Sequence, residues 1–179
     1  MGSLSLEIKA RCSEPGRIRK ILKCHRASFK GLDRQIDTYF CVPSGRLKLR
    51  EGIIENALIY YRRVNQKGSK RCDAVLMECR DAKAMKMILK ETCGVLASVD
   101  KKREIYFIKN AKFHIDRVKK LGDFAEIEVF GPVQAAAKLK KQCEFYQKIF
   151  GIRPKDLVRD SYSDKILKAG KRPTGNGQR

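Results

Sequence analysis

Two short stretches in the second half of the chain place acidic side chains where they could act together. One is Phe113-His114-Ile115-Asp116, and the other is Phe124-Ala125-Glu126-Ile127-Glu128-Val129. Side chains two apart in a strand share a face, so Asp116, Glu126 and Glu128 are predicted on one side of adjacent strands. Carboxylates crowded together repel each other and are costly to bury unless a cation joins them. The pattern therefore indicates a divalent metal site.

The charge of the chain is strongly positive. Its 179 residues contain 41 Lys and Arg against 20 Asp and Glu, which gives a formal net charge of +21. Such a chain attracts polyanions, among them nucleotides, polyphosphate, nucleic acid and acidic membrane surfaces. A basic, solvated surface is the alternative explanation. Together with the carboxylates, the charge favours a metal that is held for a polyphosphate substrate.

Length and cysteine content favour one cytoplasmic domain. A chain of 179 residues can bury a sizeable core. Its seven cysteines show no C-x-x-C spacing and its two histidines no zinc pattern, so we expect reduced thiols. We find no signal peptide and no long apolar run. Residues 168–179 are basic and Gly-bearing, which predicts a flexible tail after a domain over residues 1–167 and makes the nucleus an alternative location.

Alternating patterns predict eight strands, over residues 4–12, 35–42, 47–50, 57–64, 74–79, 101–108, 111–118 and 124–130. Helices are predicted from the N-cap Ser13 to residue 24, over 82–92 and over 132–150. Most strands carry charge on one face, which does not suit a sandwich with an apolar interior. We therefore predict an α+β fold, a closed eight-stranded antiparallel β-barrel with a polar, charged lumen and flanking helices.

Strand parity predicts which charged residues line this lumen. The acidic set is Glu7, Asp116, Glu126 and Glu128. The basic set is Lys9, Arg11, Lys48, Arg50, Arg63, Lys101, Arg103 and Lys112. Carboxylates select Mg²⁺ or Mn²⁺, while Arg and Lys suit phosphate oxygens. Each short motif alone is more simply a solvated surface, and only the joint arrangement favours a site. His114 is either a general base or a hydrogen-bonded lumen residue.

In this order, the segments resemble the CYTH family, also called triphosphate tunnel metalloenzymes, and in particular its branch related to class IV adenylyl cyclases and thiamine triphosphatases. The resemblance covers roughly residues 4–167. Its most specific signatures are Lys101 to Tyr106, Phe113-His114-Ile115-Asp116 and the segment from Leu121 to Glu128. Further signatures are Ser5-Leu6-Glu7-Ile8-Lys9-Ala10-Arg11, Gln35 to Phe40, Leu47-Lys48-Leu49-Arg50-Glu51, Leu58 to Arg63, Gly68-Ser69-Lys70 and Ser161 to Leu167.

The resemblance implies a tunnel that binds a triphosphate with basic side chains and one or two Mg²⁺ or Mn²⁺ ions. It implies Glu7, Asp116, Glu126 and Glu128 as metal ligands. It implies phosphate binding by Lys9, Lys48, Arg50, Arg63, Lys101, Arg103 and Lys112. The residues that we expect to serve catalysis most directly are Glu7, Lys9, Arg103 and Asp116. Ser5 stands where the family has a Glu, so a second metal is expected to bind more weakly.

Three functions remain open from the sequence. The leading hypothesis is metal-dependent hydrolysis of tripolyphosphate or a nucleoside triphosphate. The first alternative is an adenylyl cyclase, in which the ribose hydroxyl replaces water as the nucleophile and cyclic AMP and pyrophosphate form. The second is a non-catalytic module for polyphosphate or RNA ends, which the charge, the basic tail and Ser5 favour. The absence of Trp argues against a specific thiamine triphosphatase. We expect a triphosphate-containing small molecule or polyphosphate as partner, with RNA as a further candidate, no membrane, and a monomer or homodimer.

Overall fold

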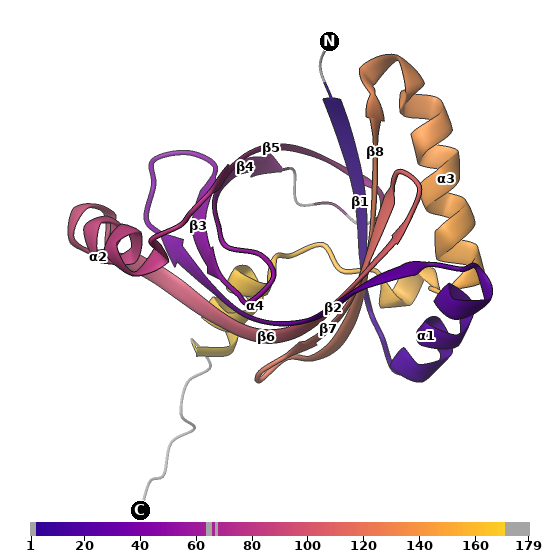
Figure 1. The fold of residues 1–179 in the computed structure, drawn as a ribbon, viewed down its shortest axis with the longest axis horizontal. Helices are drawn as coiled ribbons and strands as arrows, with labels where there is room; N and C mark the ends of the chain where they lie inside the picture. The colour runs from indigo at the N-terminus through magenta and orange to yellow at the C-terminus, as the bar shows by residue number, and fades with distance from the viewer. Residues whose placement is uncertain (1–2, 64–65, 67, 171–179) are drawn as a thin grey trace, which may run out of the picture.

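Eight antiparallel strands close into a barrel. The computed structural model describes residues 3–63, 66 and 68–170, without the side chains of Ser3, Arg63 and Asp73. The strands are β1 (Ser3–Arg11), β2 (Ser28–Phe40), β3 (Arg46–Glu51), β4 (Ala57–Arg63), β5 (Lys70–Glu78), β6 (Val95–Ile108), β7 (Ala111–Val118) and β8 (Gly122–Pro132). Around the barrel they follow the order β1-β5-β4-β3-β2-β6-β7-β8, and β8 pairs back with β1 (Figure 1). The predicted fold class is confirmed.

Helices flank the barrel on its outside and at one end. They are α1 (Pro15–Cys24), α2 (Ala82–Cys93), α3 (Ala136–Ile149) and α4 (Tyr162–Gly170), with 3₁₀ turns η1 (Val133–Ala135) and η2 (Pro154–Asp156). Helices α1 and α3 lie beside β1 and β8, and α2 lies on the opposite side near β3 (Figure 1). None of the helices in the described part of the chain combines the length and the apolar character that crossing a bilayer requires.

The main apolar core lies outside the barrel, between its wall and two helices. Strand β1 turns Leu4 and Ile8 outward, where they pack with residues of α1 and α3 such as Leu22 and Cys143. Strand alternation then sends the intervening side chains inward. Because burial of the outer face supplies the hydrophobic stabilisation, the lumen is left for charged residues.

The C-terminal segment covers one end of the lumen. Tyr162, at the start of α4, packs its ring 5.0 Å from that of Phe124 within an apolar cluster that also contains Val158. The buried Lys70 donates hydrogen bonds to the carbonyl oxygens of Val158 (2.8 Å) and Arg159 (3.1 Å). These contacts hold the C-terminal segment against β5 and so close one end of the barrel.

Several element boundaries differ from the predicted ones. Strands β2 and β6 begin seven and six residues earlier than predicted, because they pair with each other from Ser28↔Phe107 to Phe40↔Val95. The N-cap of α1 is Glu14 instead of Ser13. Strand β5 starts at Lys70, within the predicted loop. The predicted tail begins inside α4, which ends at Gly170, and residues 171–179 lie outside the described part of the chain.

Candidate functional site

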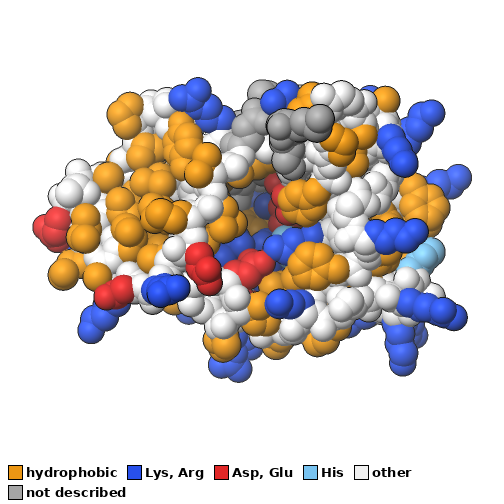
Figure 2. Space-filling model, turned by 45° about the horizontal axis from the view of Figure 1, so that its top comes forward, with side chains coloured by type: hydrophobic (Ala, Val, Ile, Leu, Met, Phe, Trp, Pro, Cys, Tyr) orange, Lys and Arg blue, Asp and Glu red, His pale blue; other side chains and the backbone are white. Residues whose placement is uncertain are grey.

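The barrel encloses a cavity of about 620 Å³. In the space-filling view it appears as a hollow at whose opening basic and acidic side chains gather (Figure 2). Among the described residues, the cations that line it are Lys9, Lys48, Arg50, Arg62, Lys101, Arg103 and Lys112. The carboxylates that line it are Glu7, Asp37, Glu126 and Glu128. Both charge types therefore share one enclosed space.

Strand register brings the charged residues to matching levels of the barrel. Across β1 and β8, Glu7 lies opposite Glu128 and Lys9 opposite Glu126. Across β7 and β8, Lys112 lies opposite Glu128. Residues directly opposite each other in an antiparallel pair are near neighbours, so these side chains interact on the inner face. The acidic residues thus concentrate on β1 and β8.

Most of the predicted site residues line the cavity, and two do not. Asp116 is buried behind Arg103 instead of facing the open space. Arg11 lies exposed at the end of β1, where it donates a 3.4 Å hydrogen bond to the carbonyl oxygen of Leu121. The side chain of Arg63 lies outside the described residues. The remaining members of both predicted sets contribute to the lining.

Glu7, Glu126 and Glu128 form what we call the acidic wall. Burial raises the pKa of Glu128, and the negative charges of Glu126 and Glu7 raise it further. The Ser5 hydroxyl, which replaces the family's carboxylate, donates a 2.8 Å hydrogen bond to Glu128 Oε1. Within the acidic wall this shift belongs to Glu128, because Lys9, His114 and Arg103 hold the pKa of Glu126 well below its ordinary value against the effect of burial.

The acidic wall fits Mg²⁺ or Mn²⁺ in the chemistry of its donors, because hard cations prefer carboxylate oxygens. Its crowding is the kind that a cation relieves. However, within the described residues no three His, Cys, Asp or Glu side chains already converge closely enough to hold an ion. To bind a metal, the carboxylates of the acidic wall would have to move closer together.

A buried ion-pair network stands beside the acidic wall. Arg103 donates through Nε (2.7 Å) and Nη2 (2.6 Å) to the two carboxylate oxygens of Asp116, and Nη2 also donates to Glu126 (2.9 Å). The Tyr162 hydroxyl donates to Asp116 at 2.7 Å. Burial alone would raise the pKa of Asp116, but Arg103 outweighs it and holds the pKa below its ordinary value. Asp116 thus orients Arg103 in this structure.

Asp37, Lys48, Arg50 and Lys101 form what we call the cationic wall. Asp37 accepts hydrogen bonds from Lys48 Nζ (3.0 Å), from Arg50 Nε (2.9 Å) and Nη2 (3.2 Å), and from Lys101 Nζ. Burial would raise the pKa of Asp37, but the three cations hold it well below its usual range. One carboxylate is thus shared by three basic side chains. Burial lowers the pKa of Lys101 well below its ordinary value, against the opposing effect of Asp37, so Lys48 and Arg50 carry the excess of positive charge.

His114 lies between the networks. Its Nδ1 is 3.1 Å from Glu126 Oε2, and its buried Nε2 has no hydrogen-bond partner. Burial lowers the pKa of His114 to about 4, with Arg103 acting in the same direction, so the imidazole is neutral at pH 7. Of the two interpretations from the sequence, a general base or a hydrogen-bonded lumen residue, the second expected the hydrogen bond that His114 makes.

Sequence reasoning overlooked three residues of this site. Asp37 was within a predicted strand, but its role depends on pairing with β3 and β6. Tyr162 belongs to a helix that was not predicted. Glu55 lies between β3 and β4 and accepts hydrogen bonds from Arg50 and Lys112. A capping-box pattern at Ser161 and Asp164, with reciprocal bonds of 3.0 and 3.1 Å, could have revealed the helix.

Solved structures with the same fold span nearly the whole chain. The PH1012 protein from Pyrococcus horikoshii OT3 is 26% identical, with a TM-score of 0.77 over 89% of this chain and 98% of that one. A provisionally assigned adenylate cyclase from Vibrio parahaemolyticus is 20% identical, with a TM-score of 0.74 over 94% and 99%. HpAC1 from Hippeastrum, for which a dominant triphosphatase activity is described, is 15% identical, with a TM-score of 0.63 over 94% and 97%.

A search of curated protein sequences finds no significant relative. The description of the CYTH domain, by contrast, matches residues 4–162, which include every strand of the barrel and the first residue of α4. The matched region also contains all charged residues that line the cavity. The chain belongs to the CYTH domain family.

Proposed function

We propose that this protein hydrolyses a phosphoanhydride bond of a triphosphate inside its barrel, with the help of Mg²⁺ or Mn²⁺. The observation that carries the proposal is the division of one cavity into a cationic wall and an acidic wall. A phosphate chain needs the first, and a divalent metal needs the second. Membership of the CYTH family and the described activity of HpAC1 support the same reaction class.

The basic residues bind and neutralise the phosphate chain. They come from four strands: Lys9 from β1, Lys48 and Arg50 from β3, Lys101 and Arg103 from β6, and Lys112 from β7. Arg103 is held rigidly by Asp116, so it reaches a phosphoryl oxygen without losing further side-chain freedom. In phosphoryl transfer such positioning and charge neutralisation account for most of the catalysis.

Glu7, Glu126 and Glu128 would hold the metal. When bound, a divalent ion neutralises phosphate charge and lowers the pKa of an attacking water. Asp116 differs from the other three, because its carboxylate is fully engaged by Arg103 and Tyr162. We therefore assign Asp116 to the positioning of Arg103, and the acidic wall to the metal. Ser5 contributes a hydroxyl in place of a fourth carboxylate.

A cyclase is the second candidate because part of the cavity is apolar. Ile59, Tyr60, Val75, Leu76 and Phe130 contribute to its lining. Such a surface accepts an organic group, as in a nucleoside triphosphate, whose ribose hydroxyl could then stand in line with the phosphate. The same cations and metal would serve this reaction, and only the nucleophile would differ.

A module that binds polyphosphate or RNA ends without turnover is the third candidate. It is favoured by Ser5 and by the finding that no metal cluster is already assembled among the described residues. The excess of 21 positive charges favours polyanions of any length. Such binding should weaken steeply with added salt, as it does for phosphate-driven contacts.

Product analysis separates these functions. The protein is incubated with tripolyphosphate or ATP in the presence of Mg²⁺, Mn²⁺ or EDTA, and the products are resolved by ion-exchange chromatography. Orthophosphate that forms only with metal supports hydrolysis, whereas cyclic AMP with pyrophosphate supports the cyclase. Tight, salt-sensitive binding without any product contradicts both enzymes and favours the module.

A further inference from the structure

The loop between β3 and β4 is fixed by a buried carboxylate. The backbone N–H groups of Ile53, Ile54 and Glu55 donate to Asp33 at 2.6, 3.0 and 3.0 Å, and Asp33 is fully buried. A Cβ at Gly52 would stand 2.7 Å from Asp33 Oδ2 and 2.8 Å from the Glu55 carbonyl oxygen, so only glycine fits there. The loop thus holds the backbone of Glu55 in one place.

From this loop Glu55 reaches two cations of the cavity. Its Oε2 accepts a 2.7 Å hydrogen bond from Arg50 Nη1, and its Oε1 accepts a 2.6 Å hydrogen bond from Lys112 Nζ. Arg50 belongs to β3 and Lys112 to β7, and both line the cavity. A single anionic group that joins a guanidinium and an ammonium in this way makes the contacts that a phosphoryl group would make.

Glu55 is not needed to orient Arg50. Asp37 already fixes the guanidinium through Nε and Nη2, which leaves Nη1 pointing at Glu55. Glu55 therefore occupies the donor that would otherwise be available to a ligand. Burial would raise the pKa of Glu55, but Arg50 and Lys112 hold it well below its ordinary value, so the carboxylate is ionised at neutral pH.

Glu55 is also more exposed than the carboxylates that pair with the other cations of the cavity. Its side chain is 23% exposed, against 2% for Asp37, 1% for Asp116 and 9% for Glu126. The three buried carboxylates cannot leave without stranding charge in the protein interior. Glu55, which also accepts a 3.1 Å hydrogen bond from Gln35 Nε2, can turn outward into water, because Gln35 Nε2 keeps its 2.8 Å hydrogen bond to Asp33. It is the partner that an incoming anion displaces most easily.

We propose that Glu55 is a built-in competitor for phosphate, which occupies Arg50 and Lys112 until a phosphate chain long enough to reach them displaces it. This inference rests on the proposed function, because it assumes that the cavity takes phosphates. Glu55 lowers the affinity for every anion at this end of the cavity. Its penalty is overcome best by a doubly charged phosphoryl group, so it disfavours singly charged anions.

The test compares Glu55→Gln with a matched control. In Glu55→Gln the side chain keeps its size and loses its charge, so the affinity for tripolyphosphate should rise by about tenfold, the usual scale of one charged hydrogen bond. The control is Glu51→Gln, which removes the same charge four residues earlier, where Glu51 pairs with Lys86 at 2.7 Å outside the cavity lining. Binding of tripolyphosphate to each variant is measured by calorimetry in metal-free buffer, so that no turnover is required.

A double-mutant cycle with Lys112→Met tests whether the gain in affinity of Glu55→Gln depends on Lys112. If Glu55 competes through Lys112, the gain from Glu55→Gln shrinks when the lysine is absent. Thermal unfolding supplies a second readout. Without ligand, Glu55→Gln should unfold at a lower temperature than the wild type, because Arg50 and Lys112 lose a partner. Added tripolyphosphate should raise the unfolding temperature of Glu55→Gln more than that of the wild type.

Four outcomes are decisive. Tighter binding by Glu55→Gln alone supports the competitor, even if wild-type protein hydrolyses nothing and the proposed reaction fails. Weaker binding by Glu55→Gln means that Glu55 positions the cations, and this overturns the inference. Equal affinity for wild type and Glu55→Gln overturns it as well. If neither protein binds tripolyphosphate in metal-free buffer, the inference is wrong, while the proposed function is judged separately by whether orthophosphate forms with Mg²⁺ or Mn²⁺.

Discussion

The acidic wall and the cationic wall face each other across one cavity, but they differ in how complete they are without a ligand. In the cationic wall, Asp37 holds three cations through four hydrogen bonds. In the acidic wall, Glu7 and Glu128 face each other across β1 and β8, and the pKa of Glu128 is raised by burial and by its negative neighbours. The cationic wall is therefore organised by hydrogen bonds before a ligand binds, whereas in the acidic wall burial and like charge disfavour the ionised form of Glu128.

This difference teaches how the two ligands would bind. The cationic wall can receive phosphate with little rearrangement, because its side chains are already fixed. The acidic wall would bind metal only as its carboxylates turn toward the ion, since no such cluster is assembled among the described residues. We therefore expect phosphate binding to be measurable without metal, and metal binding to be weak without phosphate.

The largest effect is expected from Asp37→Asn, which breaks the cationic wall. The buried Arg50 and Lys101 and the partly exposed Lys48 would lose their shared carboxylate, and stranding buried charge destabilises proteins by about 3–5 kcal/mol. The free energy of unfolding, measured with urea, should fall by that amount, and added tripolyphosphate should restore part of it. Asp123→Asn, which removes the half-buried partner of the exposed Arg117, serves as control and should change stability by less than about 1 kcal/mol.

The contribution of Asp37 should also depend on pH in one direction. Its pKa in the folded protein is well below the ordinary carboxyl value, since the three cations outweigh burial. The stabilisation is therefore complete above the unfolded pKa of about 4 and is lost as the pH falls toward the folded pKa. The free energies of unfolding of wild type and Asp37→Asn should be measured from neutral to acidic pH. Their difference should shrink only at acidic pH. A gap that stays constant down to strong acid would contradict this account.

Glu126→Ala should have the next largest effect, and it breaks the acidic wall. The substitution removes a carboxylate that contacts Lys9, Arg103 and His114. The metal-dependent rate of hydrolysis should fall by at least about a hundredfold, a typical loss for a group that stabilises developing charge. The measurement is kcat/KM for tripolyphosphate at saturating Mn²⁺.

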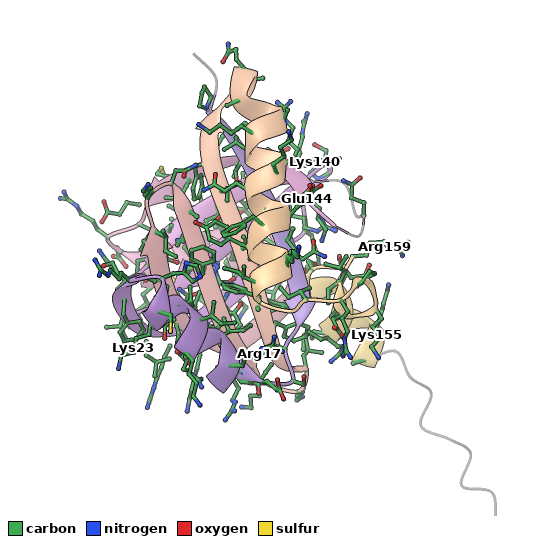
Figure 3. The ribbon with its side chains drawn as sticks, turned by 90° about the vertical axis from the view of Figure 1, so that its right-hand side faces the viewer. Arg17, Lys23, Lys140, Glu144, Lys155 and Arg159 are labelled. Carbon is green, nitrogen blue, oxygen red and sulfur yellow. The ribbon has the colours of Figure 1, made fainter. Side chains whose placement is uncertain are left out.

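The control for Glu126→Ala is Glu144→Ala, which removes an exposed carboxylate from the outer surface of α3 (Figure 3). It should leave the rate unchanged. If Glu126→Ala hydrolyses tripolyphosphate as fast as wild type, the assignment of the acidic wall to metal is wrong.

The strands that carry the two walls, and the face on which each charged residue lies, could be predicted from the sequence, because side chains alternate between the two faces of a strand. Once residues 4–12 and 124–130 are strands, Glu7, Glu126 and Glu128 must share a parity, and an apolar opposite face sends them inward. Strands with one charged face then predicted a closed barrel with a polar lumen, and the family resemblance implied the same architecture. No local pattern, however, reports the register between strands, and register decides that Asp116 stands behind Arg103.

The parts that escaped prediction depend on contacts distant in sequence. Asp37 meets Lys101 sixty-four residues later, and Glu55 is placed by Asp33 through the backbone of its loop. Periodicity describes one element at a time and does not show either contact. Arg11 has the parity of Lys9, but it lies where β1 leaves the barrel, and parity does not show where a lumen ends.

A smaller effect is expected from Ser5→Glu, which restores a carboxylate to the acidic wall. The added ligand charge should lower the Mn²⁺ concentration for half-maximal activity by about tenfold, because ligand charge tunes metal affinity. Without metal the variant should be less stable, since the Ser5 hydroxyl contacts Glu128 and a carboxylate in its place would bring like charges together. Ser5→Ala is the control, which loses only the hydrogen bond to Glu128. A higher Mn²⁺ requirement for Ser5→Glu would contradict the placement of the metal.

The smallest effect is expected from Arg11→Ala, which sharpens the boundary of both walls. The Arg11 side chain is exposed and stacks 5.4 Å from the Phe124 ring, outside the cavity lining. Its loss should change kcat/KM by less than about twofold, as is usual for surface substitutions.

Lys9→Ala is the comparison on the same strand, because Lys9 is buried, lies 3.3 Å from Glu126 and lines the cavity. It should lower kcat/KM by at least about tenfold, since it removes a charge that would contact phosphate directly. Equal losses in the two variants would mean that the phosphate chain extends past the end of β1, beyond both walls.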